Sequence, residues 1–295
     1  MLDWFLTYQS LFAFIGINSL LALSVYCTLS CGQLSLANAG FMAVGAYAAA
    51  LLTVRAHAPF PLALIAATLL PAIVAIPLGL PVLRLRGVFL AIATIGFGEV
   101  VRLAFVNWDY TNGALGLVAI PQKTSLWMVW IALALALYVL GRLRGSRIGY
   151  ALEAIRQDEP AARAIGIAST QYKVAMFAFG AALAGLAGAL EAHFTFMVAP
   201  SGYGFGRVVE MLVYAVVGGD TIFYAPVLGA AFLTTLPEAL RSAGQAVGLA
   251  PGPLRLFVNG AILLAVILFL PNGLVSLPEA MRGLRMRRMP RAPLG

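Results

Sequence analysis

The stretch QYKVAMFAFGAALAGLAGALEAHFTFM, residues 171–197, indicates most directly how this chain folds. It is apolar through its middle and exceeds the roughly 20 apolar residues that a helix needs to cross a bilayer. Gly180, Ala184 and Gly188 recur every four residues, with Gly185 alongside. Small residues at that spacing let helix backbones approach closely within a membrane. The stretch therefore predicts a spanning helix that packs tightly against its neighbours.

The rest of the chain has the same character. Of its 295 residues, 62% are hydrophobic and 10% are charged, whereas an average soluble domain is about 45–50% apolar and about 25% charged. The surplus apolar surface must face lipid. Other apolar segments lie near 5–29, 34–54, 62–83, 87–107, 124–142, 207–221, 223–241 and 255–275. We therefore predict an all-α, polytopic membrane bundle over residues 1–278, with about 8–10 transmembrane segments, some of them re-entrant or broken, and a basic tail over 279–295.

The charged residues predict how the bundle is oriented. The formal net charge is +8, and the positive residues sit beside apolar segments, which favours membrane orientation over nucleic-acid binding. Three basic clusters stand out: Arg84 and Arg86; Arg142, Arg144, Arg147, Arg156, Arg163 and Lys173; and Arg282, Arg285, Arg287, Arg288 and Arg291. Even numbers of segments separate them, so all three can face the cytoplasm. The C-terminus is then inside, and nine spans place the N-terminus outside. The short segment 207–221 is a candidate re-entrant element.

The sequence lacks the motifs of an ATPase or a metalloenzyme. Its only lysines, Lys123 and Lys173, follow Gln122 and Tyr172, so neither belongs to a phosphate-binding GxxxxGK[ST] loop. HExxH, paired Cys-x-x-Cys and Asp-rich metal motifs are also absent from the sequence. We expect a non-enzymatic chain without a cofactor or a metal site.

The stretch IGYALEAIRQDEPAARAIGI, residues 148–167, is the most unusual one outside the apolar segments. Asp158 before Glu159 and Pro160 is typical of a helix N-cap and first turn, and Gly166 is typical of a helix end. We predict two short helices with a bend at 158–160. On the residues alone, docking of a soluble partner and an amphipathic helix on the lipid surface are equally supported.

Three other stretches place polar groups or paired glycines in apolar surroundings, at 32–47, 83–100 and 215–230. Ionisable groups at membrane depth are costly, so they should face a cavity, a partner or the interface. The candidate pathway residues are Gln33, Ser35, Asn38, Thr94, Glu99, Glu210, Gly218, Gly219 and Thr221. Glu99 with Arg102, and Arg207 with Glu210, are three residues apart and predict ion pairs on one helical face.

Four motifs in order give the chain a family resemblance: GQLSLANAGFMAVGAY, LRLRGVFLAIATIGFGE, AIRQDEPAARAIGI and GGDTIFYAPVLGA. Together they resemble the inner-membrane permease of bacterial branched-chain amino acid ABC importers, in its LivM-like branch. The resemblance runs from about residue 16 to 275. The chain departs from the usual family pattern at 36–41 and at 218–226, which bears on the substrate more than on the fold.

The resemblance implies a division of labour. A LivH-like sister permease would complete the pathway, two cytoplasmic ATPases would bind the coupling loop at about 145–170, and a periplasmic binding protein would deliver the substrate. It assigns ATPase coupling to Glu153, Ala154, Arg156, Asp158, Glu159, Ala162 and Gly166. Short amides or urea are alternative substrates for the same machinery. An ion-coupled secondary transporter is an alternative of a different class, with Glu99 and Glu210 as its candidate carriers.

Overall fold

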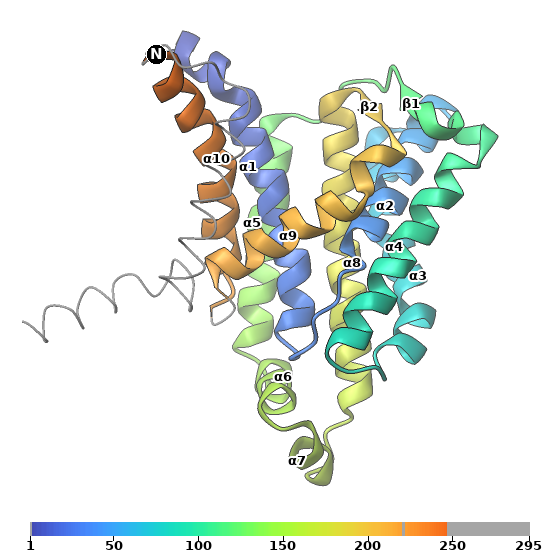
Figure 1. Cartoon of the computed structure of the whole chain (residues 1–295), viewed down its shortest axis with the longest axis vertical. Coiled ribbons are helices and arrows are strands. Elements are labelled where there is room, and N and C mark those ends of the chain that lie inside the picture. Colours follow the sequence, from blue (N-terminus) through green and yellow to red (C-terminus); the bar gives the residue numbers. More distant parts are fainter. Residues whose placement is uncertain (1, 220–221, 247–295) are drawn as a thin grey trace, which may run out of the picture.

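The computed structural model describes residues 2–219 and 222–246, and this part of the chain is almost entirely helical (Figure 1). The long helices are α1 (Leu2–Leu29), α2 (Asn38–Val54), α3 (Phe60–Val82), α4 (Val88–Val106), α5 (Leu126–Arg144), α8 (Ser169–Thr195), α9 (Phe205–Gly218) and α10 (Ala225–Ala246). The short elements are η1 (Asp109–Thr111), η2 (Gly113–Leu115), β1 (Leu117–Val118), α6 (Arg147–Gln157), α7 (Glu159–Ala164), β2 (Met197–Val198) and η3 (Pro200–Tyr203). The predicted segment 255–275, the tail 279–295 and Thr221 lie outside the described residues.

The helices form a bundle with α1 and α8 at its centre. Within the described residues, α1, α3, α4, α5 and α8 are long and apolar enough to span a membrane, and α2 is a shorter apolar helix. Most of α1 and α8 is buried inside the bundle, whereas less than a third of α3, α4 and α5 is buried. Exposed helices this apolar belong in lipid, so the predicted polytopic membrane fold is confirmed.

The small residues of α8 explain why it can occupy the centre. A Cβ atom at Gly180 would lie 2.7 Å from the carbonyl oxygen of Ser24 in α1. A Cβ at Gly185 would overlap the carbonyl oxygen of Ala67 in α3, and one at Gly188 would overlap that of Met42 in α2. The predicted close approach of helix backbones is confirmed, since α8 touches the backbones of three helices through its glycines.

The predicted segment 34–54 is broken. Its helix begins only at Asn38, and residues 33–37 belong to no helix or strand. In Figure 1 this non-helical stretch rises from the end of α1 to the start of α2, partway up the bundle. Non-helical backbone is tolerated at membrane depth only where protein or water covers it. Here protein does so, because Ser35, Leu36 and Ala37 are buried.

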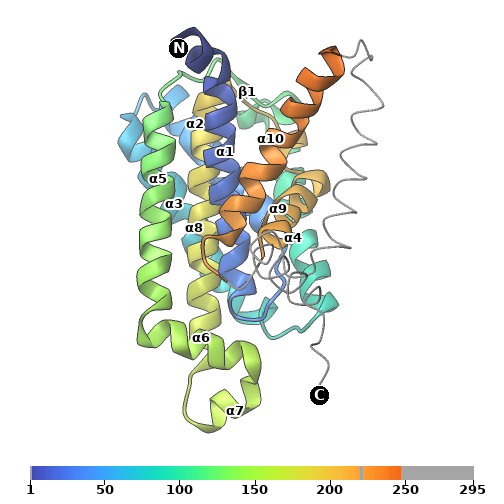
Figure 2. The same cartoon turned by 90° about the vertical axis from the view of Figure 1, so that its left-hand side faces the viewer.

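The helix α9 is short and lies obliquely across the bundle (Figure 1). At about 1.5 Å per residue its 14 residues extend roughly 20 Å, less than the roughly 30 Å of a bilayer core. From its end, α10 returns toward the end of the bundle where the N-terminus lies (Figures 1 and 2). This arrangement supports the prediction that 207–221 enters the membrane without crossing it.

The helices α6 and α7 project from the end opposite the N-terminus (Figures 1 and 2). The α3–α4 connection lies at the same end, because Arg86 Nη2 is 3.8 Å from Glu159 Oε2 in α7. The first two basic clusters therefore share one end, as predicted. At the other end β1 pairs with β2 and ties the long α4–α5 connection to the end of α8.

Candidate functional site

The two-helix element α6–α7 is built by local signals. Ser146 caps α6, its Oγ accepting a hydrogen bond from the amide of Ile148 at 3.2 Å. The inner face of α6 is apolar and buried through Ala151, Leu152 and Ile155. Asp158 ends α6 and caps α7, its Oδ1 accepting a bond from the amide of Ala161 at 3.0 Å. Both helices and the bend at 158–160 are confirmed.

The end of α7 also follows its sequence signal. Gly166 adopts a φ of +89°, a conformation that favours glycine. The amide of Ile167 then donates to the carbonyl oxygen of Ala162 at 3.0 Å, which satisfies an end group of the helix. Ala162 is buried beneath the turn, and Gly166 is exposed. Both predicted coupling residues therefore shape α7.

Glu153 lies on the outward face of α6. Its side chain is 50% exposed, and Oε2 is 3.7 Å from Nε of Arg156. The side chain of Gln157 donates a hydrogen bond to Oε1 at 3.1 Å. Ala154 is half-buried beside it. Glu153 thus presents a solvent-accessible carboxylate at the projecting end of the protein.

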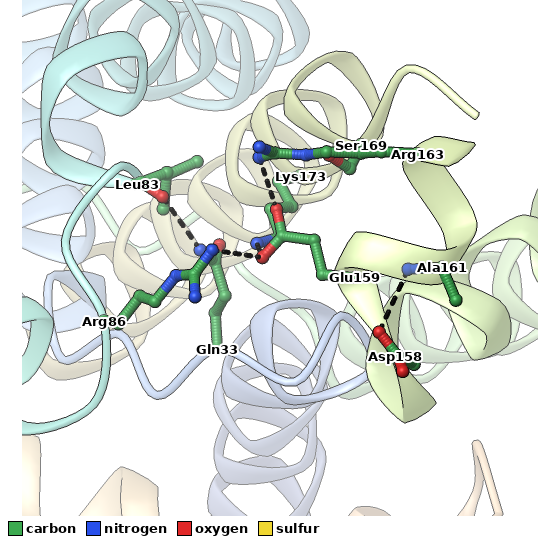
Figure 3. Close-up of polar contacts among 9 residues, drawn as sticks. All are labelled: Gln33, Leu83, Arg86, Asp158, Glu159, Ala161, Arg163, Ser169 and Lys173. Carbon is green, nitrogen blue, oxygen red and sulfur yellow. Dashed lines mark hydrogen bonds and ion pairs between the residues drawn. The ribbon is translucent and has the colours of Figure 1, made fainter. Parts of the chain in front are cut away.

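Glu159 is turned toward the bundle. Its carboxylate lies 2.8 Å from Lys173 Nζ in α8 and 2.6 Å from Arg163 Nη2 in α7, and Arg86 approaches it from the α3–α4 connection (Figure 3). The side chains of Glu159 and Lys173 are only 14% and 8% exposed. We name Glu159, Lys173, Arg163 and Arg86 the Glu159 junction.

Gln33 lies beside this junction. Its Nε2 donates to the carbonyl oxygen of Leu83, at the end of α3, at 3.1 Å. Figure 3 shows this amide next to the guanidinium of Arg86. A residue predicted for the pathway and one predicted for coupling therefore lie side by side. The junction joins the α1–α2 and α3–α4 connections to α7 and α8.

The Glu159 junction predicts a pH dependence. Partial burial raises the pKa of Glu159, but the hydrogen bond and charge of Lys173 and the charge of Arg163 outweigh it and hold the pKa below its ordinary value of 4.5. A lowered carboxyl pKa contributes stability that is present above the unfolded value and is lost as pH falls through the folded value.

Between about pH 5 and 8 we therefore expect no change in the melting temperature of the purified protein from the titration of Glu159. At pH values below about 4 we expect the melting temperature to decrease. Glu159→Gln should melt lower than wild type at neutral pH, and the two should converge as the pH falls below about 4. Melting in detergent at a series of pH values measures both curves. An unchanged gap between them in acid would contradict the assignment.

The predicted pathway residues Ser35, Asn38 and Thr94 are buried from solvent, and each takes part in a hydrogen bond within the bundle. Asn38 Nδ2 donates to Ser24 Oγ at 2.8 Å, and Ser35 Oγ accepts from the amide of Ala37 at 3.4 Å. The amide of Leu36 donates to Thr94 Oγ1 at 2.9 Å. These bonds hold the non-helical stretch 33–37 in place. Lining of a pathway by these three residues stays a prediction.

Replacing Thr94 by valine is expected to destabilise the protein by about 1–3 kcal/mol, because the buried amide of Leu36 loses its acceptor. Thr94→Ser keeps the hydroxyl and serves as the matched control. The free energy of unfolding in detergent measures the difference. Equal stability of the valine and serine variants would show that this hydrogen bond does not hold the stretch.

Both predicted ion pairs, Glu99 with Arg102 and Arg207 with Glu210, are confirmed. Glu99 Oε2 is 2.7 Å from Arg102 Nε, and Arg207 Nη1 is 3.0 Å from Glu210 Oε2. Arg207 Nη2 also lies 2.5 Å from Glu191 Oε2 in α8, a contact that the sequence spacing does not indicate. Gly204 lies beside Glu99 and Arg102, and it precedes Arg207 by three residues. The two ion pairs are therefore neighbours.

Gly218 and Gly219 end α9 where it meets α10. A Cβ at Gly218 would overlap the carbonyl oxygen of Ala225, and Gly219 adopts a φ of +108°. The end of α9 at Gly218 therefore packs directly against the first residues of α10. Across residues 2–219 and 222–246, no three His, Cys, Asp or Glu side chains gather into a group that could hold a metal ion.

Known proteins are similar in sequence to this chain over most of its length. The family model of the branched-chain amino acid transport system permease component matches residues 7–267. The high-affinity branched-chain amino acid transport system permease protein LivM of Salmonella typhimurium is 31% identical, over 89% of this chain and 67% of that protein. The corresponding LivH protein of Escherichia coli strain K12 is 30% identical over 187 residues, 63% of this chain and 58% of that one.

In a comparison of structures, this chain also aligns with a chain of PsaBC from Streptococcus pneumoniae in complex with Fab. The alignment covers 90% of this chain and 95% of that chain, with a TM-score of 0.48 and 15% sequence identity. The family match and the LivM relative establish the family, and it is one of transport permeases rather than enzymes. This multi-pass membrane protein belongs to the branched-chain amino acid transport permease family.

Proposed function

We propose that this chain is one permease subunit of a binding-protein-dependent ABC importer in the bacterial inner membrane. It translocates branched-chain or other hydrophobic amino acids inward, and separate subunits hydrolyse the ATP. Membership of the family supports the transport role, and the named activity of the LivM and LivH relatives supports the substrate class. A LivH-like sister permease, two ATPases and a periplasmic binding protein complete the importer.

The observation that carries the proposal is the projecting element α6–α7. It lies beyond the membrane-spanning helices, at the end that holds the first two basic clusters (Figure 2), and basic clusters face the cytoplasm. Tyr150 and Ile165 are 75% and 76% exposed on it. Exposed apolar side chains beside an accessible carboxylate, Glu153, are typical of a protein-binding surface. We therefore assign this surface to an ATPase.

The pathway is proposed to run along α4 and α9. Glu99 in α4 and Glu210 in α9 are partly exposed, at 35% and 55%, and the two helices lie on the same side of the bundle in Figures 1 and 2. Because ionisable groups avoid lipid, this side should face the sister permease and the water-accessible route between the subunits. Each carboxylate is paired with an arginine, which disfavours the proton-carrying role that an ion-coupled transporter would need.

The substrate class is tested in proteoliposomes that contain the two permeases, the ATPases and the binding protein. Labelled leucine, urea and acetamide are supplied in turn with ATP on the ATPase side. We expect leucine uptake to exceed urea and acetamide uptake by about tenfold or more, since an apolar side chain contributes several kcal/mol of selectivity. Preferential uptake of urea or acetamide would overturn the amino-acid assignment.

A further inference from the structure

Glu159 differs from Glu153 because two of its charged partners, Lys173 and Arg86, belong to other elements of the bundle. Lys173, Arg163 and Arg86 surround its carboxylate (Figure 3). Arg163 is itself held by a hydrogen bond from its Nε to Ser169 Oγ at 2.6 Å. Lys173 and Arg163 lie within hydrogen-bond distance of the carboxylate and Arg86 lies at 3.8 Å, so less of its acceptor capacity is left for an arginine or lysine of another protein. Glu153, at 50% side-chain exposure, has that capacity.

Lys173 connects Glu159 to the most extensively packed helix. It lies near the start of α8, with its side chain 8% exposed. Farther along α8, Gly180 and Gly188 bring the helix against the backbones of α1 and α2. Helices packed this closely move as units. A displacement applied at Lys173 is therefore passed to the centre of the bundle.

The covalent connection between α7 and α8 contains a glycine in an open position. It passes through Gly166, which is exposed and adopts a positive φ. No atom of the described residues lies within 4 Å of the position that its Cβ would take, apart from its immediate chain neighbours. The connection therefore leaves room for bending at Gly166, and the Glu159–Lys173 ion pair and the bond from Arg163 Nε to Ser169 Oγ hold α7 to α8.

We infer that Glu159 and Lys173 are positioning residues that transmit movement of α6–α7 to α8, and that Glu159 does not itself bind the ATPase. The inference rests on the proposed function, in which an ATPase binds α6–α7. Outward-facing Glu153 serves attachment and inward-facing Glu159 serves transmission. Breaking the ion pair should leave the ATPase bound and active but separate hydrolysis from transport.

The test compares Glu159→Gln and Lys173→Met with Glu153→Gln, an outward carboxylate of the same element, in the complete importer. Three quantities are measured: ATPase co-purification, ATP hydrolysis, and leucine taken up per ATP hydrolysed. We expect Glu159→Gln and Lys173→Met to keep ATPase co-purification and to lower uptake per ATP by about tenfold or more. Glu153→Gln should weaken co-purification and keep uptake per ATP.

Two further variants separate transmission from a general structural role. Lys173→Arg keeps the charge and should restore uptake per ATP. Cysteines at 159 and 173, joined by a bifunctional thiol reagent of matching reach, remove both charges but restore a link, so cross-linking should raise uptake per ATP relative to the same protein left unlinked. A bound-partner role for Glu159 could not be restored in this way.

The outcomes distinguish the inference from the proposed function. Lost ATPase co-purification in Glu159→Gln, or an unchanged uptake per ATP, would overturn the transmission role while leaving the proposed function intact. If either substitution prevents folding, the cross-linked cysteine pair decides, and no gain on cross-linking overturns the inference. Absence of ATP-dependent uptake by the wild-type importer would instead overturn the proposed function.

Discussion

Replacing Gly185 by leucine is expected to prevent stable folding of this permease. Gly185 lies in α8 where a Cβ would overlap the carbonyl oxygen of Ala67 and lie 2.5 Å from Cγ of Pro71, both in α3. Gly45 of α2 packs on the backbone of Gly185 itself. A side chain here must push backbone rather than a flexible neighbour, so α2, α3 and α8 cannot keep their present spacing.

Overpacking of a core usually costs about 1–3 kcal/mol, and a backbone overlap should exceed that range. We expect Gly185→Leu to lower the melting temperature by about 10 °C or more, or to abolish accumulation in the membrane. Gly96→Leu is the matched control, because Gly96 is exposed on α4 and its Cβ would meet no described atom within 4 Å. Fluorescence-detected gel filtration across a temperature series measures both. Equal melting of the two variants would contradict the packing of α8.

Reversing the charge of Glu153 is expected to detach the ATPase while leaving the permease folded. Glu153 is half-exposed, and its contacts in the described structure are with Arg156 and Gln157 of the same helix. Loss of an exposed ion pair changes stability by less than about 1 kcal/mol. A reversed charge at a protein interface costs several kcal/mol, so Glu153→Arg should reduce ATPase co-purification by about tenfold or more.

The control for Glu153→Arg is Lys123→Glu, which reverses a charge at an exposed position. Lys123 belongs to the α4–α5 connection, which lies at the end of the bundle opposite α6–α7. It should leave ATPase co-purification unchanged. Quantitative pull-down with tagged permease measures both variants, and gel filtration confirms that they fold. Full ATPase recovery with Glu153→Arg would remove Glu153 from the docking surface.

The parts of the fold that were predictable are those set by residues close together in sequence. The bend at 158–160 follows from Asp158 as a helix cap, and the end of α7 follows from Gly166. Both signals act within one helical turn. The Glu99–Arg102 pair likewise depends only on a spacing of three along one helix.

The orientation of Glu159 depends on distant residues and was not predictable. Its charge and its place next to Asp158 indicate an exposed docking residue, because nothing local shows where α7 will rest. The structure turns it inward because Lys173 and Arg86 approach from α8 and from the α3–α4 connection. Opposite charges far apart in sequence carry no periodic signal that would pair them.

The polar residues of the first motif show a second kind of limit. Gln33, Ser35 and Asn38 stand in an apolar stretch, which indicates a cavity or a pathway. In the structure they make hydrogen bonds at a break in the helix, such as Gln33 to Leu83 and Asn38 to Ser24. The sequence shows that polar side chains are needed at this depth in the membrane. It does not show their role, because the same residue types make hydrogen bonds inside a bundle and line a transport pathway.

We propose that this permease moves its substrate only with ATP hydrolysed by a separate subunit. The most direct measurement is uptake of labelled leucine into proteoliposomes holding this chain with its sister permease, ATPases and binding protein, with ionophores collapsing every ion gradient. We expect uptake that requires ATP and persists with the ionophores, and no uptake by this chain alone. Uptake by this chain alone, driven by an ion gradient and abolished by the ionophores, would contradict this proposal.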